Sequence, residues 1–306
     1  MINLEEIFEH SQLDELLNEE SLAIQSMVDE AKGKDHKKGT IQSMVDFLQK
    51  YDGQDIFISF RDTIHTSYLN LKTSFRTPVG FYSYPFGIMA NRILTHYGFK
   101  ENEWESLLKI DEHRMFQSHF FPFKVDSEFM FLFHLGSKEG IFYTSNLDDS
   151  RIPEYVDRIK SLYSDNEEAL KVCDYFVTNG YSIGSPYVQG GAEKRGVWGL
   201  WLLLYRVLDA VGKTEKSKNF TIFCHKLGIN GFVDNDGLGM IHPNEKTQGV
   251  FFKPKTTFDD VMVLSKTKGQ NFPLNRDKPT TRYNIPTNKY LKESIEDILG
   301  FMKRIS

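Results

Sequence analysis

The sequence predicts an α+β fold, in which a mostly antiparallel sheet is interrupted by helical insertions. Short β-prone runs such as Phe129-Met-Phe-Leu-Phe-His134 alternate irregularly with longer segments whose apolar residues recur at helical spacing. This irregular alternation disfavours a doubly wound parallel sheet. The sequence contains no Gly-x-Gly-x-x-Gly, Walker, His-Glu-x-x-His or Cys-x-x-Cys motif. Rossmann domains, P-loop enzymes and structural zinc sites are therefore disfavoured.

Residues 1–52 are expected to form an acidic helical segment. Apolar spacing predicts one or two amphipathic helices over 3–30, a turn at 32–39, and a second helix at 40–50 that begins with Thr40 as its cap. The first 30 residues carry nine acidic side chains and no Lys or Arg. The hexapeptide Ile-Gln-Ser-Met-Val-Asp occurs twice, at 24–29 and 41–46, but one recurrence does not indicate a repeat architecture.

Residues 53–265 are expected to form the main α+β domain. The pattern predicts strands at 55–60, 79–84, 129–134, 140–144, 230–234, 249–253 and 260–264. It predicts helices at 87–97, 102–109, 151–163, 165–178, 192–211 and 215–227, of which 192–211 is apolar enough to be buried. Residues 266–306 are expected to form a basic loop followed by a C-terminal helix at 286–304.

Composition argues against a membrane or secreted protein. No apolar run approaches the ~20 residues that a helix needs to span a bilayer, and the N-terminus lacks a signal-peptide pattern. Only two cysteines occur, Cys173 and Cys224, so a disulfide framework is excluded and a cytoplasmic location is expected.

Charge is distributed unevenly along the chain. Residues 251–306 carry eleven basic and six acidic side chains, in contrast to the acidic N-terminus. Two interpretations stay open. The two ends dock against each other, or the basic quarter forms a surface for nucleic acid or an acidic protein, which the acidic helices mask.

A polar, glycine-rich loop precedes the predicted strand at 249–253. It begins with Asp234-Asn-Asp-Gly-Leu-Gly239, the apolar run Val250-Phe-Phe252 follows it, and four hydrogen-bonding residues stand between: His242, Asn244, Glu245 and Gln248. Such side chains at the end of a buried strand often build small-molecule sites, because the strand fixes them while the loop can move. A hairpin loop with solvating side chains is the alternative.

Two earlier blocks share this character. Thr77-Pro-Val-Gly-Phe-Tyr-Ser-Tyr-Pro85 alternates as a half-buried strand between prolines, which places Tyr82 and Tyr84 on one face. The strand that precedes it, at 56–60, ends in polar residues that include Ser59 and Arg61.

In this order the blocks resemble the ADP-ribosyltransferase superfamily, in the variant whose motif residues are His, Tyr and Glu. Gly80-Phe-Tyr82 looks like the Gly-Ile-Tyr strand, and Gln248-Gly-Val-Phe-Phe252 looks like the strand that starts at the catalytic glutamate. The approach segment Leu227–Val233 is also similar to that of these folds. The resemblance covers residues 55–265. More specifically, the pairing of the block 77–85 with Ile241-His-Pro-Asn-Glu-Lys-Thr-Gln248 looks like transferase-like domains of phages and mobile elements.

The resemblance implies a split, mostly antiparallel sheet with helical insertions and an enzyme that uses NAD as a substrate without a metal. It implies transfer of ADP-ribose to a macromolecular acceptor, protein or nucleic acid, by a toxin or a phage-defence effector. A neutralising partner protein is one expected partner, and no membrane is involved.

The resemblance also implies roles for individual residues. Tyr82 stacks on the nicotinamide ring, Tyr84 extends that wall, and Phe60 with nearby backbone groups holds the carboxamide. The residues expected to bind NAD are Ser59, Phe60, Arg61, Thr77, Gly80, Tyr82, Tyr84, His242 and Asn244. The residues expected to act in catalysis are Gln248, Glu245 and Tyr82.

Two positions depart from the family pattern. Ser59 stands where a histidine or arginine is expected, and Gln248 stands where the glutamate is expected. Gln248 can still hydrogen-bond a ribose hydroxyl, but it carries no charge. Glu245 is the expected substitute acid, and His65 and Arg61 are expected to compensate for the charge missing at Ser59. A catalytically silent domain that binds NAD, nucleic acid or a partner protein is the alternative function.

Overall fold

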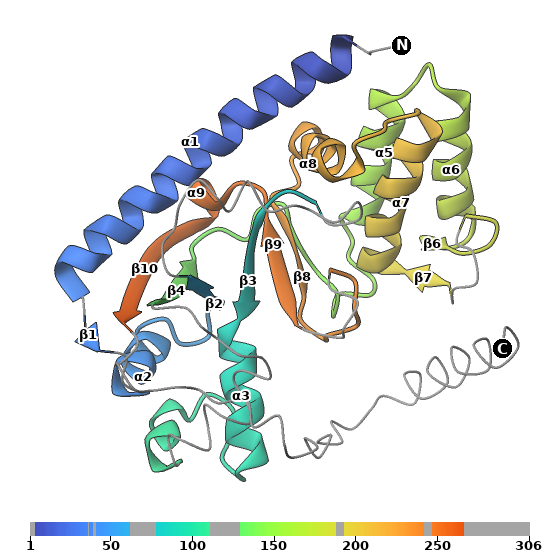
Figure 1. The fold of residues 1–306 in the computed structure, drawn as a ribbon. Helices are drawn as coiled ribbons and strands as arrows, with labels where there is room; N and C mark the ends of the chain where they lie inside the picture. Colours follow the sequence, from blue (N-terminus) through green and yellow to red (C-terminus); the bar gives the residue numbers. More distant parts are fainter. Residues whose placement is uncertain are drawn as a thin grey trace, which may run out of the picture.

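The computed structural model describes residues 4–35, 37–38, 41–61, 78–110, 129–187, 193–241 and 247–265, and its ribbon is shown in Figure 1. The strands are β1 (Lys37–Lys38), β2 (Ile56–Arg61), β3 (Phe81–Pro85), β4 (Phe129–Leu135), β5 (Ile141–Tyr143), β6 (Ser182–Ile183), β7 (Lys194–Arg195), β8 (Gly231–Asp234), β9 (Gln248–Phe251) and β10 (Phe258–Ser265). The helices are α1 (Leu4–Asp35), α2 (Ile41–Lys50), α3 (Phe86–His96), the 3₁₀ helix η2 (Trp104–Lys109), α5 (Ile152–Leu162), α6 (Glu167–Thr178), α7 (Gly196–Ala210), α8 (Lys216–Leu227) and α9 (Pro254–Thr257).

One large mixed sheet organises the chain. Its strand order is β1-β10-β4-β2-β3-β9-β8-β5, and the short pair β6-β7 forms a second sheet. Five neighbouring pairs of the large sheet are antiparallel, and the two pairs at its ends, β1 with β10 and β5 with β8, are parallel. The predicted mixture of helices with one large, mostly antiparallel sheet is therefore confirmed.

Local sequence chemistry fixes several helix ends. The Asn166 side chain accepts a hydrogen bond from the Ala169 N–H at 2.9 Å and caps α6. Proline occupies the first turn of α5, where its missing N–H leaves no bond unmade. Gly228 ends α8 in the left-handed conformation, with φ of 76°.

Three predicted elements differ from the structure. Helix α1 is one continuous helix that runs through much of the turn predicted at 32–39. A glycine inside a helix costs only about 1 kcal/mol, and packing of Ile24, Val28 and Ala31 on the sheet offsets this cost. The segment predicted as a helix at 102–109 is a 3₁₀ helix, and α7 begins at Gly196 instead of 192. The helix predicted at 286–304 lies outside the described residues.

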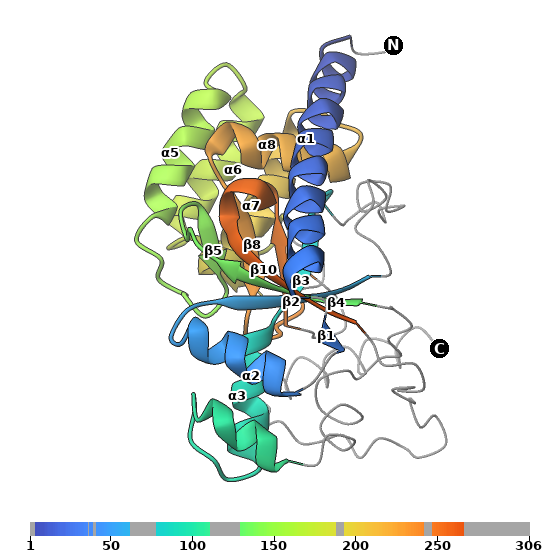
Figure 2. The same cartoon turned by 90° about the vertical axis from the view of Figure 1, so that its left-hand side faces the viewer.

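Helix α1 covers one face of the sheet. Its residues Ile24, Val28 and Ala31 share a core with inward-facing aromatic residues of the strands, including Phe57, Phe81, Phe131, Phe133 and Phe251. In Figure 2 this helix lies on the opposite side of β2, β4 and β10 from α2 and α3. The predicted N-terminal segment, residues 1–52, thus packs into the same body as the main domain wherever it is described.

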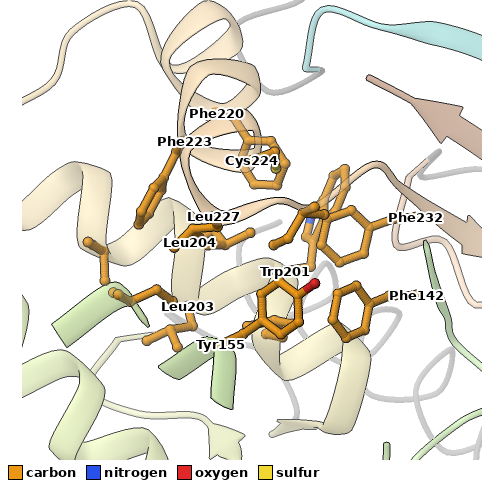
Figure 3. Close-up of a cluster of buried hydrophobic side chains, with 14 of the residues drawn as sticks. Phe142, Tyr155, Trp201, Leu203, Leu204, Phe220, Phe223, Cys224, Leu227 and Phe232 are labelled. Carbon is orange, nitrogen blue, oxygen red and sulfur yellow. The ribbon is translucent and has the colours of Figure 1, made fainter. Parts of the chain in front are cut away.

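Two separate groups of helices cover the other face. Helices α2, α3 and η2 pack on β2 and β4 through a core that includes Ile58, Leu132 and Trp104. Helices α5 to α8 pack on β5, β8 and β9 through a larger core around Trp201 and Phe232, shown in Figure 3. The boundary between the two groups falls at β3, in the middle of the sheet.

Several acidic side chains of α1 contact residues far along the chain. Glu9 lies between Lys213 and Lys226, and Asp14 faces Lys218 at 3.5 Å. Residues 213–226, in and beside α8, therefore supply one counter-surface. The start of the basic C-terminal quarter supplies another, because the Lys255 N–H donates to the Glu20 carboxylate at 2.6 Å, so the expected docking of the two ends is seen in part. Most of that quarter, 266–306, lies outside the described residues.

No helix in the described ranges combines the length and the apolar character that crossing a bilayer requires.

Candidate functional site

Three sequence blocks that lie far apart in the chain become adjacent strands. Strand β3 pairs with β2 on one side and with β9 on the other, antiparallel in both cases. The pairing with β2 involves only Tyr84 and Pro85, at one end of β3, whereas the pairing with β9 involves Phe81, Tyr82 and Ser83 at the other end. Strand β3 therefore joins two halves of the sheet that separate along its length.

Tyr82 and Tyr84 lie on the face that the two helix groups share, as predicted from their spacing. Exposure alternates along β3, and Phe81 of the opposite face packs in the core beneath α1. Tyr82 packs against the core of α5 to α8, whereas Tyr84 packs against the core of α2 and α3. The two tyrosines thus stand on either side of the boundary between the helix groups.

The Tyr82 phenol is held in place by hydrogen bonding and burial. Its hydroxyl donates to the Pro78 carbonyl at 2.5 Å. Burial, together with the neighbouring Tyr205, raises the pKa of Tyr82 well above its usual value, so the phenol is neutral at any physiological pH. Burial also raises the pKa of Tyr84. Both residues therefore present neutral aromatic surface instead of a proton-transfer group.

Gly80 has a packing role that the sequence did not reveal. A Cβ at this position would lie 2.8 Å from Val250 Cγ2 and 3.1 Å from the Phe251 carbonyl oxygen. Only glycine therefore lets the start of β3 approach β9 this closely.

Ser59 lies on the other face of the sheet from the two tyrosine rings. It alternates with Ile58, which is paired with Tyr84, and it shares the face of Phe57 beneath α1. Its hydroxyl donates to the main-chain carbonyl of Tyr82 at 3.4 Å, at the point where β2 and β3 separate. Phe60, not Ser59, occupies the face that carries the tyrosines, because it packs on the α2–α3 core. Ser59 is thus placed to support the Tyr82 backbone and not to contact a ligand beside its ring.

Gln248 lies at the beginning of β9 on the tyrosine face. Val250, two residues further, is paired with Tyr82, so alternation places Gln248 on the same face, one position beyond the Ser83–Gly249 pair. Across β8 it is paired with Asp234. Both side chains are buried, with 8% and 0% of their residue surface exposed.

Asp234 organises the polar loop that follows β8. Its two carboxylate oxygens accept hydrogen bonds from the backbone N–H groups of Leu238, Gly239 and Met240, each at 2.9 Å. The Thr144 hydroxyl donates to the same carboxylate at 3.3 Å. The first polar residue of the loop therefore serves loop architecture, as the hairpin interpretation anticipates for this part of the segment.

Arg92 is the residue of this region that the sequence analysis missed. It projects from α3 and donates to the Asn235 main-chain carbonyl at 3.0 Å. Burial and the charge of Asp234 raise the pKa of Asp236, the next loop carboxylate, while the charge of Arg92 opposes that rise. A lone arginine in the helix Phe86–His96 is the only sequence signal of this contact.

Five of the expected site residues cannot be placed with their side chains. Thr77, His242, Asn244 and Glu245 lie outside the described residues, and for Arg61 only the backbone, as the last residue of β2, is described. The described part of the expected site is therefore Phe60, Tyr82, Tyr84 and Gln248 on one face, with Gly80 and Ser59 in supporting positions.

A cavity lies apart from this face. This cavity of about 280 Å³ between α2 and η2 is lined by Gln49, Asp52, Asn102, Glu103, Trp104 and Glu105, and the Trp104 indole donates to Asp52 at 2.8 Å. Among the residues that the structure describes, no group of three or more His, Cys, Asp or Glu side chains is placed to hold a metal ion.

No protein-family model, curated protein or solved structure matches this chain.

Proposed function

We propose that this chain is an NAD-dependent ADP-ribosyltransferase that modifies a macromolecular acceptor. The observation that carries the proposal is the adjacency of β2, β3 and β9. These strands bear the three blocks that resemble the family, and the sheet divides at the middle one. A chance likeness between three short sequence blocks gives no reason for them to meet as neighbouring strands.

The side chains that meet on this face suit recognition of a nicotinamide group. Tyr82 and Tyr84 offer neutral aromatic surface, on which an aromatic ring can stack. Gln248 offers an amide, which can donate to and accept from a ribose hydroxyl. Holding the ring and the ribose at a fixed angle favours departure of nicotinamide through an oxocarbenium-like transition state.

This chemistry also needs a carboxylate that stabilises the developing positive charge. Gln248 is neutral, and both oxygens of its neighbour Asp234 already accept backbone hydrogen bonds. In the proposal Glu245, three residues before Gln248, supplies the carboxylate. A silent domain that binds NAD, nucleic acid or a partner protein without cleaving NAD is the second candidate, and it is favoured by the engagement of Asp234.

The test is nicotinamide release from NAD by the purified full-length chain, with labelled NAD added to candidate proteins and RNA to detect transfer. Tyr82→Ala is expected to abolish release. Ser83→Ala is the matched control, because Ser83 is the next residue of the strand and faces away from the tyrosine rings. NAD binding without release would favour the silent domain, and the absence of both would exclude either form of the proposal.

We also propose a biological setting for this activity. A cytoplasmic toxin or phage-defence effector, with a protein that neutralises it, fits an enzyme that modifies macromolecules. Transfer to a defined acceptor in a cell lysate is the measurement that identifies the target.

A further inference from the structure

The N-terminal half of α1 contacts the segment that leads into β3. Leu13 and Leu17 form a small buried cluster with Val79, and Ile222 of α8 packs against it. All three members are nearly fully buried, with 3%, 3% and 6% of their surface exposed. Val79 stands three residues before Tyr82, so this cluster connects the first helix of the chain to the strand that carries the expected nicotinamide wall.

Ion pairs and a hydrogen bond hold the same half of α1 in place. The Glu9 carboxylate pairs with Lys213 at 2.7 Å and also with Lys226, and the side chains of Glu9 and Lys213 are only 11% and 14% exposed. Burial raises the pKa of Glu9, but the two lysines outweigh burial and hold it below its usual value. Glu6 adds a hydrogen bond from the Asn219 side chain at 2.8 Å.

The backbone at Val79 connects these contacts of α1 to Tyr82. The Val79 N–H donates to the Ser217 carbonyl at 3.3 Å, and the Thr221 hydroxyl donates to the Val79 carbonyl at 2.7 Å. The preceding residue, Pro78, supplies the carbonyl that accepts the Tyr82 hydroxyl. Helices α8 and α1 thus hold Val79, and the residue before it, Pro78, orients the Tyr82 phenol.

We propose that α1 is a positioning element for Tyr82, acting through the Leu13–Leu17–Val79 cluster and the Glu9 ion pairs. The inference rests on the proposed function for its consequence, which is that NAD binds tightly only while the N-terminal half of α1 is docked. Leu13, Leu17 and Val79 are then positioning residues, because they form a cluster of their own and act on Tyr82 through the backbone at 78–79.

The two halves of α1 are held by different amounts of packing. The C-terminal half contributes Ile24, Val28 and Ala31 to the extensive core over the sheet, whereas the N-terminal half relies on the three-residue cluster and on ion pairs. Local opening occurs most readily in the part of a helix that has fewer buried apolar contacts. A weakened N-terminal half is therefore expected to loosen residues 78–82 while the rest of the fold stays closed.

The test compares Leu13→Ala and Glu9→Gln with Asp14→Asn in the full-length protein. Asp14→Asn is the matched control, because Asp14 also faces a lysine of α8 from α1, but at 3.5 Å and with its side chain 60% exposed. Amide hydrogen exchange is measured in residues 79–84 and, as an internal reference, in β4. NAD affinity is measured on the same samples.

Both test variants are expected to exchange roughly tenfold faster in residues 79–84 with no change in β4, and to bind NAD about tenfold more weakly. Asp14→Asn is expected to match the wild type. Restoring the pairing with opposite charges, in Glu9→Lys combined with Lys213→Glu and Lys226→Glu, should return exchange to the wild-type rate.

The outcomes separate this inference from the proposed function. Unchanged exchange in residues 79–84 of both test variants overturns the positioning role, whatever NAD does. Equal acceleration in β4 also overturns it, because the effect is then global destabilisation. If the wild type fails to bind NAD while exchange changes locally, the coupling of α1 to Tyr82 stands and the proposed function fails.

Discussion

Gln248 lies directly opposite Asp234, where β9 pairs with β8. The two residues occupy the tyrosine face at the level where the polar loop leaves the sheet, and both are buried. The position expected to hold a catalytic glutamate is thus beside a carboxylate that is already engaged. A glutamate here would add a second negative charge against Asp234, which gives one physical reason for an amide at this position.

Gln248→Glu is expected to raise nicotinamide release, because a carboxylate stabilises developing positive charge far better than an amide does. The expected gain is roughly a hundredfold, measured as turnover of NAD. The same change should lower stability by about 1 kcal/mol at neutral pH, because like charges then face each other across the strand pair. Gln248→Met is the control for size, and equal turnover in all three proteins would place the active site elsewhere.

Tyr82→Phe and Tyr82→Ala are expected to differ in their effect on NAD binding. The phenylalanine keeps the stacking surface and removes only the hydrogen bond to Pro78, so stability should fall by about 1 kcal/mol with little loss of affinity. The alanine removes the ring from the α5–α8 core, costs about 3 kcal/mol, and should abolish the thermal shift that NAD produces. Equal shifts in wild type and Tyr82→Ala would contradict the role of the ring.

The fold was largely predictable because helix and strand periodicities are local. The strands around Tyr82 and Gln248 and the helix that carries Arg92 follow from short-range patterns of apolar residues and from prolines and glycines. The shared face of Tyr82 and Tyr84 followed from the two-residue repeat of a strand.

The orientation of Ser59 was not predictable in the same way. The strand Ile56-Phe-Ile-Ser-Phe60 is apolar on both faces, because helices cover both sides of the sheet there, so its alternation does not mark which face carries the site. The contact of Arg92 with Asn235 and the pairing of Glu9 with Lys213 join residues far apart in the chain. Such contacts depend on tertiary packing, for which a single sequence holds no local signal.

Asp234→Ala is expected to disorder the loop that begins at Asn235. The change leaves three backbone N–H groups without their acceptor, at a cost of about 3 kcal/mol. Urea unfolding measures the loss. Asp236→Ala, in the same loop but only partly buried, is the matched control and should change stability by less than about 0.5 kcal/mol. A small effect of both changes would mean that the loop does not depend on this carboxylate.

Gly136→Ala, directly after β4, is expected to destabilise the protein by about 2 kcal/mol, as overpacking does. The new Cβ would lie 2.3 Å from Asp259 Oδ2, and this carboxylate sits at an irregularity of β10 beside the His134 imidazole. Asp259→Gly removes the obstructing atoms, so the double variant should be more stable than the sum of the single effects predicts, by about 1 kcal/mol. Strict additivity in this cycle would show that the clash relaxes at no cost.

His225 is expected to make the protein less stable as the pH falls below neutral. Burial, with the charge of Lys253 as a smaller cause, lowers the pKa of His225 from 6.5 to about 4, and its Nε2 is buried without a hydrogen-bond partner. Between these two pH values the unfolded chain binds a proton that the folded chain does not bind. The stabilising contribution is therefore complete above pH 6.5 and is lost as the pH falls toward 4.

Replacing the His225 imidazole should weaken the dependence of stability on pH. In His225→Gln the free energy of unfolding should decrease by about 2 kcal/mol less than in the wild type when the pH is lowered from neutral to about 4, after allowance for partial solvent screening. Urea unfolding at closely spaced pH values measures both curves, and their difference at pH above 7 corrects for the change in packing. Parallel curves through the acid range would mean that His225 is protonated to the same extent in the folded and unfolded states, which contradicts its buried, unpaired nitrogen.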